Sequence, residues 1–375
     1  MAAIRPLLFV ANSAWNLRNF RGSLIRDFVD RGWPVAAAVP AGDEPLGLPC
    51  PTYPFPLQAD GTRPVAELRS LLALVRLCLE LRPGVLFSFT PKANIYAGLA
   101  ARVTGTPFVP NISGLGRGVV AGGTVRRVQM ALYRPALAHA ARVFFQNSDD
   151  RRRLTEAGMV REERAAMLPG SGVDLQRFRA LALPKRDPGE AHLLFVGRLL
   201  GDKGLRILAE AMRRVQASRQ GVQLTLVGFL GAANPSAITP DELRGWEEEG
   251  LLRWAGESDN VQPFHADADA LVLPTLGGEG VPRSLLEGAA SGRPLITTDV
   301  PGCRELVREG DNGFLVSPGD PEALARAILR FADLPLAERK RMGASARRTV
   351  EAGYDEQRVI AAYAEAVMTL TAWAS

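Results

Sequence analysis

Two cations follow a strand-like apolar run in the second half of the chain. The run covers residues 192–197 and ends in Gly197; Arg198 comes next, and Lys203 stands five residues further on, directly before a helix-period segment. Cations at the carboxyl end of a strand and beside a helix N-terminus attract phosphate, because side-chain charge and helix dipole act together. The spacing therefore predicts a diphosphate clamp. The plainer interpretation is that both are ordinary exposed loop cations.

Two carboxylates, eight residues apart, follow a second apolar run at residues 270–274. Glu279 lies in a glycine-rich loop, and Glu287 lies about two turns into the helix that we expect next. A carboxylate accepts hydrogen bonds at two oxygens, so Glu279 can bind sugar hydroxyls and Glu287 can hold the two hydroxyls of a ribose. A solvated helix face is the alternative for Glu287. The backbone N–H groups that can cradle phosphate belong to Val281, Arg283 and Ser284.

The sequence lacks the residue patterns of several other common functional sites. The three cysteines and three histidines are scattered without a C-x-x-C, which gives no metal site and fits a reducing compartment. No G-x-G-x-x-G follows a strand and no P-loop occurs, so a nicotinamide or ATP site loses its main support. Asp267 and Asp269 have the D-x-D form of a metal site. They directly precede the run 270–274, at the wrong end of a strand for a ligand, so we expect no metal there.

Strand-like runs alternate with helix-period segments along the whole chain. This alternation predicts an α/β fold in which parallel sheets carry helices on both faces. In such sheets, ligands bind outside the carboxyl ends of the strands. The expected strands are residues 7–11, 35–39, 85–89, 108–111, 142–146, 192–197, 222–227, 251–254, 270–274, 294–297 and 313–316.

The helical segments carry signals of their own. A helix is expected near residues 204–217, and a last helix at about 355–373. Asp320 and Pro321 place a good N-cap before a proline at the first helical position, which predicts a helix to about residue 331. Residues 65–81 have an amphipathic stripe. The stripe consists of Val65, Leu68, Leu72, Val75 and Leu79.

Length and composition bound the architecture. A chain of 375 residues, 47% hydrophobic and 23% charged, is typical of a folded protein of two domains, at about 100–200 residues per domain. No apolar run reaches about 18 residues, so we expect no transmembrane helix, and we interpret residues 7–11 as a first strand rather than a secretion signal. Residues 169–190 are rich in proline and glycine. We therefore predict domains at 1–170 and 191–354, with a linker at 171–190.

Charge is unevenly divided between the halves. Residues 1–170 hold 21 Lys and Arg against 12 Asp and Glu, whereas residues 171–375 hold 24 against 28. A basic first half suggests an anionic partner, and solvated helix faces are the alternative. Residues 117–140 form a basic amphipathic segment that can lie in a membrane interface, or can simply cover the sheet. We expect an anionic membrane surface as partner and no nucleic acid.

The cation pair and the Glu279-x7-Glu287 pair together resemble the retaining nucleotide-sugar glycosyltransferases of family 4. Their GT-B fold consists of two Rossmann-like, doubly wound domains that face each other across a cleft. The resemblance covers nearly the whole chain. Within the family, the chain most resembles the bacterial enzymes that extend polyprenyl-diphosphate-linked sugars in O-antigen, capsule and glycan assembly. The strings that carry this narrower match are residues 90–96, 111–116, 145–149, 234–238 and 279–284.

The resemblance implies roles for the second-domain residues. Arg198 and Lys203 match the cations on the donor diphosphate, Glu279 the carboxylate on the donor sugar, and Glu287 the carboxylate on the ribose. The last helix, about 355–375, is implied to cross back to the first domain. Many relatives carry His where this chain has Ser113, and Gly where it has Pro282. The donor base is implied to lie along residues 256–261. The remaining donor-binding residues implied are Gly197, Gly256, Glu257, Gly280, Val281, Arg283 and Ser284.

The implied reaction is a transfer with retention of configuration. Front-face displacement needs no protein nucleophile, because a donor phosphate oxygen can take the acceptor proton; a double displacement through paired carboxylates stays open. Arg198 and Lys203 would take a metal's place on the leaving diphosphate, so we expect no cofactor and no metal. The expected donor is UDP-linked N-acetylgalactosamine, followed by galactose or N-acetylglucosamine.

The first domain is expected to bind the acceptor, a polyprenyl-diphosphate-linked saccharide. Two alternatives stay open: the same chemistry on a soluble acceptor, and a catalytically silent module that binds a nucleotide sugar. The lipid-linked acceptor places the protein in the cytoplasm, peripherally attached to the inner face of the cytoplasmic membrane. The candidate acceptor residues are Lys92 and Asn94 after the strand 85–89, Asn111 and Ser113 at the strand 108–111, and Arg18 and Arg21 near the first helix.

Overall fold

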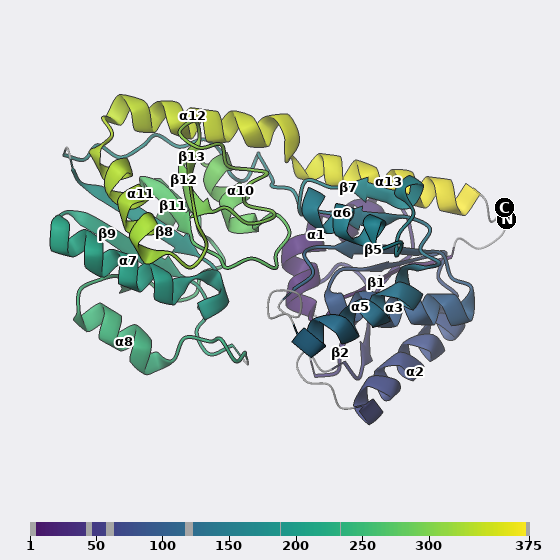
Figure 1. The fold of residues 1–375 in the computed structure, drawn as a ribbon. Helices are drawn as coiled ribbons and strands as arrows, with labels where there is room; N and C mark the ends of the chain where they lie inside the picture. The colour runs from purple at the N-terminus through teal and green to yellow at the C-terminus, as the bar shows by residue number, and fades with distance from the viewer. Residues whose placement is uncertain are drawn as a thin grey trace. The chain divides into compact units, whose positions relative to one another are not determined.

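The computed structural model describes residues 5–42, 47–57, 64–116, 123–187, 189–232 and 234–372. The chain folds into two compact units (Figure 1). The first comprises Met1–Ser171, Gly278–Gly280 and Glu356–Ser375, and the second comprises Gly172–Gly277 and Val281–Asp355. No helix among the described residues is long and apolar enough to cross a membrane.

The first unit is built on a seven-stranded sheet in which all described pairings are parallel. The strand order is β3-β2-β1-β4-β5-β6-β7. Because helices cover both faces of such a parallel sheet, the sequences of its central strands are continuously apolar. The strands are β1 (Leu7–Val10), β2 (Val35–Pro40), β3 (Thr52–Phe55), β4 (Val85–Ser88), β5 (Phe108–Ile112), β6 (Val143–Phe145) and β7 (Ala165–Met167).

Two helical layers cover this sheet. One core cluster joins one face of the sheet to α1 (Ala14–Asp30) and α13 (Glu356–Ala372). The other joins the opposite face to α2 (Pro64–Leu81), α3 (Pro91–Thr104) and α5 (Gly123–Leu137). The short helices α6 (Ser148–Glu156) and η1 (Glu162–Arg164) lie between β6 and β7. The last helix of the chain thus contributes to the first core.

Helix α2 turns its amphipathic stripe outward. Leu74, Leu77 and Cys78 are the large side chains it buries. In contrast, four members of the stripe, Val65, Leu68, Leu72 and Leu79, are exposed, and Val75 is partly buried. Both faces of the helix are apolar, so the sequence stripe marks the face that the sheet does not cover.

The second unit is built on a six-stranded parallel sheet of order β10-β9-β8-β11-β12-β13. Its strands are β8 (Ala191–Val196), β9 (Val222–Val227), β10 (Arg253–Trp254), β11 (Ala270–Leu273), β12 (Leu295–Thr298) and β13 (Gly313–Val316). Its helices are η2 (Gly201–Lys203), α7 (Leu205–Ser218), α8 (Pro240–Glu248), α9 (Gln262–Asp267), α10 (Arg283–Ala290), α11 (Pro321–Asp333) and α12 (Leu336–Gly353).

Local capping explains two helix starts of this unit. The Asp320 side chain accepts from the Ala323 N–H at 2.9 Å, and Pro321 begins α11, which confirms the predicted start. Thr239 and Glu242 form a capping box at α8, which the sequence analysis missed. The two sheets therefore have the parallel topology that the alternation predicts, and each has a carboxyl edge at which ligands can bind.

Candidate functional site

Backbone contacts hold together the loops at the carboxyl edge of the second sheet. The Gly197 N–H donates to the Val227 carbonyl at 3.0 Å, and the Gly228 N–H donates to the Gly256 carbonyl at 2.8 Å. A Cβ on Gly228 would lie 1.8 Å from the Gly197 carbonyl oxygen. The loops after β8, β9 and β10 thus touch backbone to backbone, which leaves no room for a side chain at Gly228.

The turn that carries Lys203 is locked in the same way. Gly204 has φ +80°, and a Cβ there would lie 1.9 Å from the Pro274 carbonyl oxygen. The Leu276 N–H donates to the Asp202 carbonyl at 2.9 Å. These contacts fix η2 against the loop after β11, and α7 begins at the residue after Gly204.

The predicted cations follow β8 at this edge. Arg198 is exposed, and among the described residues its side chain forms no hydrogen bond or ion pair. Lys203 is partly buried in η2, beside the N-terminus of α7. The Arg198 side chain, exposed and without an internal partner at the end of a strand, can bind an anionic ligand directly, and the N-terminus of α7 beside Lys203 adds to the attraction.

Glu287 lies inside α10, and its side chain is only 13% exposed. The helix begins at Arg283, so Glu287 is little more than one turn into it, not about two turns as predicted. The Arg283 Nε donates to the Glu287 Oε1 at 2.9 Å, one helical turn apart. Burial raises the pKa of Glu287, although Arg283 and Arg177 act in the opposite direction. The carboxylate is thus held in place by Arg283 at a cost in desolvation.

Arg177 is a site residue that the sequence analysis missed. It lay within the stretch interpreted as linker, yet it belongs to the second unit and is close enough to Glu287 to lower the pKa of that carboxyl. Its guanidinium donates to the Asp259 carbonyl at 3.1 Å. Asp174 accepts from the Arg177 N–H at 2.8 Å. This turn at Asp174 is the sequence signal that could have indicated an ordered segment.

Arg177 connects two predicted parts of the site. Asp259 belongs to the segment after Gly256 and Glu257, which the resemblance assigns to the donor base. A pocket of about 470 Å³ lies beside Arg177 and includes Asn260, Gln262 and Ser291 in its lining. Glu257 is exposed, so this wall of the site is open to a ligand.

The loop 278–280 belongs to the first unit. The Gly116 N–H donates to the Gly278 carbonyl at 3.0 Å, and the Gly280 N–H donates to the Ser113 carbonyl at 2.9 Å. Glu279 and Gly280 therefore lie beside the Ser113 loop after β5, whereas Val281, Arg283 and Ser284 belong to the second unit. Within the second unit, the structure brings together Gly197, Gly256 and the β8 loop that carries Arg198.

The asparagines at the carboxyl edge of the first sheet are buried in a network. The Ser88 hydroxyl donates to Asn94 Oδ1 at 2.6 Å, and Asn94 Nδ2 donates to the Asn111 carbonyl at 3.0 Å. Asn111 Nδ2 donates to the Tyr363 hydroxyl at 2.8 Å, and Gln146 Nε2 donates to Asn111 Oδ1 at 3.1 Å. Burial raises the pKa of Tyr363 to about 12, so it stays protonated. Asn94 and Asn111 thus position loops and are not open at the surface.

The other predicted acceptor residues differ in exposure. Lys92 forms an ion pair with Glu67 at 2.9 Å, and both side chains are about one-quarter exposed or less. The Ser113 hydroxyl donates to the Phe89 carbonyl at 2.8 Å. Arg21 is buried with its guanidinium 4.6 Å from the Phe89 ring centre, whereas Arg18 is exposed. Arg18, Lys92 and Ser113 are the members of this set that a ligand can reach.

The D-x-D pair lies at the amino ends of β8 and β11, as expected from its place in the sequence. Asp269 is fully buried, forms an ion pair with Arg186 at 2.6 Å and accepts from the His192 N–H at 2.7 Å. The Asp267 carboxylate lies 2.9 Å from His192 Nδ1, and burial lowers the pKa of that imidazole. These carboxylates therefore stabilise the entry into the second sheet and do not face its carboxyl edge.

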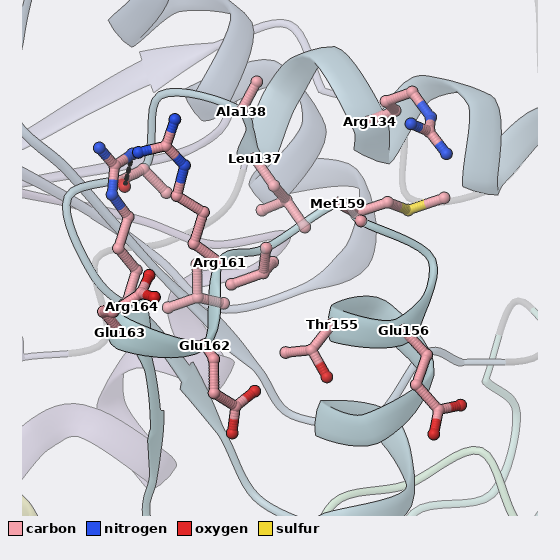
Figure 2. A pocket seen from close by; sticks show the side chains of 14 residues that line it. Arg134, Leu137, Ala138, Thr155, Glu156, Met159, Arg161, Glu162, Glu163 and Arg164 are labelled. Atoms are coloured by element: carbon pink, nitrogen blue, oxygen red, sulfur yellow. Dashed lines mark hydrogen bonds between the residues drawn. The ribbon is translucent and has the colours of Figure 1, made fainter.

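The first unit has a pocket of about 1040 Å³ (Figure 2). The predicted acceptor residues lie at the opposite edge of the sheet. Apart from Val143, the first residue of β6, the residues that line the pocket precede β6 or β7, so the pocket faces the amino ends of these strands. Arg161 and Arg164 lie on one side and Thr155 and Glu156 on the other. None of the predicted site residues lines it, and both charge signs occur there.

Comparison with known proteins covers both units. Residues 18–170 match the family model described as glycosyl transferase 4-like domain, and residues 190–333 match the one described as glycosyl transferases group 1. The chain is similar to the Staphylococcus aureus protein named capsular polysaccharide biosynthesis glycosyltransferase CapM. That relative is 25% identical over 303 residues, which cover 78% of each chain.

A second relative and a solved structure extend the comparison. The Campylobacter jejuni N,N'-diacetylbacillosaminyl-diphospho-undecaprenol alpha-1,3-N-acetylgalactosaminyltransferase is 22% identical over 340 residues, 85% of this chain and 87% of the relative. Anabaena HepE, solved in complex with UDP-glucose, superposes with a TM-score of 0.78 at 19% identity, over 97% of this chain and 99% of that one. At this identity the likeness to HepE concerns the fold.

Proposed function

Since the chain belongs to the family 4 glycosyltransferases and has their GT-B fold, we propose that it transfers a hexose or N-acetylhexosamine from a nucleoside-diphosphate sugar to a lipid-linked saccharide. The observation that carries the donor half of this proposal is Arg198. It is an exposed cation without an internal partner, on a turn fixed by backbone contacts at the carboxyl edge of a parallel sheet.

The donor is bound mainly by the second unit. Arg198, Lys203 and the N-terminus of α10 neutralise the diphosphate, and Glu287, held by Arg283, accepts from the ribose hydroxyls. The base lies along residues 256–261, where Arg177 holds the Asp259 backbone. UDP-linked N-acetylgalactosamine is the donor that we favour, because the Campylobacter relative is named for that sugar.

The reaction retains the anomeric configuration. An acceptor hydroxyl attacks the anomeric carbon as the bond to the diphosphate oxygen breaks, and its proton passes to a donor phosphate oxygen. Negative charge grows on the leaving diphosphate, where Arg198 and Lys203 stabilise it. Glu279 contacts the donor sugar. These cations supply the charge that a metal would supply, so we expect EDTA to leave the rate unchanged.

The acceptor is a polyprenyl-diphosphate-linked saccharide, bound by the first unit at the inner face of the cytoplasmic membrane. Arg18, Lys92 and Ser113 are the exposed or partly exposed residues at its predicted site. The support is the Campylobacter relative, whose name includes an undecaprenol-diphospho acceptor, and the basic character of the first half of the chain.

The proposal is tested by incubating the protein with UDP-, GDP- and ADP-sugars and a polyprenyl-diphosphate-linked saccharide. We expect transfer from a UDP-sugar with retained configuration, and none after Glu279→Ala, which should fold normally. Arg198→Ala should weaken binding of the nucleoside diphosphate by about 10- to 100-fold in calorimetry, the worth of a hydrogen bond to a charged group. Arg348→Ala, an exposed arginine on α12, is the matched control. Equal affinity of both variants would contradict the clamp.

A further inference from the structure

The outer face of the α2–α3–α5 layer is apolar. Helix α3 contacts both α2 and α5, so the three helices form one layer on the first sheet (Figure 1). Eight of the fourteen large hydrophobic side chains that are exposed among the described residues lie on this layer. They are Val65, Leu68, Leu72 and Leu79 on α2, Val103 on α3, and Val125, Val128 and Leu132 on α5.

These side chains form stripes along their helices. Val65, Leu68 and Leu72 on α2 have i, i+3, i+7 spacing. Val125, Val128 and Leu132 have the same spacing on α5. The four on α2 are between 55% and 67% exposed. Helices of the second unit show no such stripe in the described residues, because the large exposed hydrophobic residues there, Leu181, Phe229 and Leu276, all lie in loops.

The same face is strongly basic. The sequences of α2, α3 and α5 contain seven cations and two carboxylates, Glu67 and Glu80. Both carboxylates are paired within the layer, Glu67 with Lys92 and Glu80 with Arg76. The exposed arginines among these cations are Arg69, Arg76, Arg102, Arg126, Arg127 and Arg134.

We propose that this face docks on an anionic lipid bilayer, with α2 and α5 lying in the interface. Apolar side chains that alternate with arginines fit a bilayer surface, where anionic headgroups cover a hydrocarbon core. The arginine guanidinium groups reach the lipid phosphates while the leucine side chains enter the boundary with the acyl chains. The excess positive charge selects anionic lipid over a neutral surface. The inference rests on the proposed lipid-linked acceptor, which would reach the first unit from the membrane on which that unit lies.

The α5 arginines belong to the basic segment predicted from the sequence, whose residues 117–122 lie outside the described residues. Helix α2 is the new element. Its stripe carries one arginine between Leu68 and Leu72, so its contribution is mainly apolar burial, whereas α5 contributes adjacent arginines at 126 and 127. Salt should therefore weaken the α5 contribution and leave much of the α2 contribution.

The test is co-sedimentation of the full chain with vesicles of phosphatidylglycerol and phosphatidylcholine, and of phosphatidylcholine alone. Wild type should bind the anionic vesicles at low salt and lose most binding in high salt. Leu68→Asp/Leu72→Asp should lower the partition constant by about tenfold or more. Arg126→Glu/Arg127→Glu should lower it by a similar factor and flatten the salt dependence. The matched controls are Met368→Asp on α13 and Lys340→Glu/Arg348→Glu on α12, all exposed, which should bind like wild type.

Transfer to a short, water-soluble analogue of the acceptor separates this inference from the proposed function. The docking variants should keep wild-type transfer to that analogue, since neither pair belongs to the donor or acceptor residues. Wild type that fails to bind anionic vesicles at low salt, or docking variants that bind as well as the controls, would overturn the membrane assignment. If wild type binds the vesicles but transfers no sugar, the proposed function would be overturned and the docking surface would still be supported.

Discussion

The carboxyl edges of the two sheets share a parallel topology and differ in what builds them. In the second unit, backbone meets backbone at Gly204 and Gly228, and charged side chains such as Arg198 stay available. In the first unit, the polar side chains Asn94 and Asn111 are consumed by a buried network. Under the proposed function, the second edge keeps its charged side chains for an anionic ligand. The first edge uses its amide side chains to hold its own loops in place.

The largest effect is expected where the second edge is built by backbone. Gly204→Ala should destabilise the protein by more than about 4 kcal/mol or prevent folding, because a left-handed residue is strained and its Cβ would meet the Pro274 carbonyl oxygen at 1.9 Å. Urea denaturation measures this. Gly231→Ala is the control: φ is +91° with nothing within 4 Å, so strain alone, about 1–2 kcal/mol, should remain. Similar losses in both variants would show that the close approach does not matter.

The next effect separates ligand binding from stability at the same edge. Glu287→Gln should weaken binding of the nucleoside diphosphate by about tenfold or more, since the amide accepts at one oxygen where the carboxylate accepts at two. Burial raises the pKa of Glu287 above its ordinary 4.5, so its contribution to stability is present below that value and lost as pH rises through the folded pKa.

Glu287→Gln should therefore unfold at the same or a higher urea concentration than wild type at pH 7. The difference between the two proteins should shrink below pH 4.5, where the carboxyl is protonated in both the folded and the unfolded chain. A variant that is less stable at pH 7 would mean that the Arg283 contact outweighs desolvation. Donor affinity, measured by calorimetry, is checked in parallel.

A moderate effect is expected in the side-chain network of the first edge. Tyr363→Phe removes the hydroxyl that accepts from Asn111 Nδ2 at 2.8 Å and leaves that donor buried. The expected loss is about 1–3 kcal/mol in the free energy of unfolding, with unchanged donor affinity. Tyr53→Phe, on the edge strand β3 and partly buried, is the control with little expected loss. If Tyr363→Phe changed donor affinity, the two edges would not be independent.

The smallest effect concerns Lys92. Because Glu67 holds Lys92 in a partly exposed ion pair worth about 1 kcal/mol or less, Glu67→Gln should change stability little. It should lower the KM for the lipid-linked acceptor by a few-fold, by releasing the ammonium for the acceptor phosphate. Lys92→Met should raise the same KM. If both variants changed this KM in the same direction, the assignment of Lys92 to the acceptor site would be wrong.

Much of the fold could be predicted because central parallel strands are buried on both faces. The runs at β1, β4, β8 and β11 were found for that reason. The edge strands β3 and β7 were missed, since Thr52–Phe55 contains a proline and Ala165–Met167 is too short and small for a periodic signal. Helices α8 and α12 were also missed. The capping box at Thr239 was the available signal for α8.

The positions of the candidate site residues could be predicted where motif and topology coincide, but not where packing decides. Arg198 and Lys203 follow β8, as their spacing indicates. The burial of Asn111 and Arg21 could not be foreseen, because it depends on Tyr363 and Phe89, which come from distant parts of the chain. Likewise, no periodicity shows which apolar face of α2 meets the sheet, since both faces carry leucines.

Helix α13 completes the first unit from a part of the chain that is synthesised after the whole second unit. Its residues Val359, Ile360 and Tyr363 pack with Phe87 and Phe144 in the interior of the first unit. On the ribosome, residues 1–171 must therefore wait while the entire second unit is translated, with the face that α13 completes covered by α1 alone. The second unit can close its own interior first, so maturation of the two halves runs against their order in the gene.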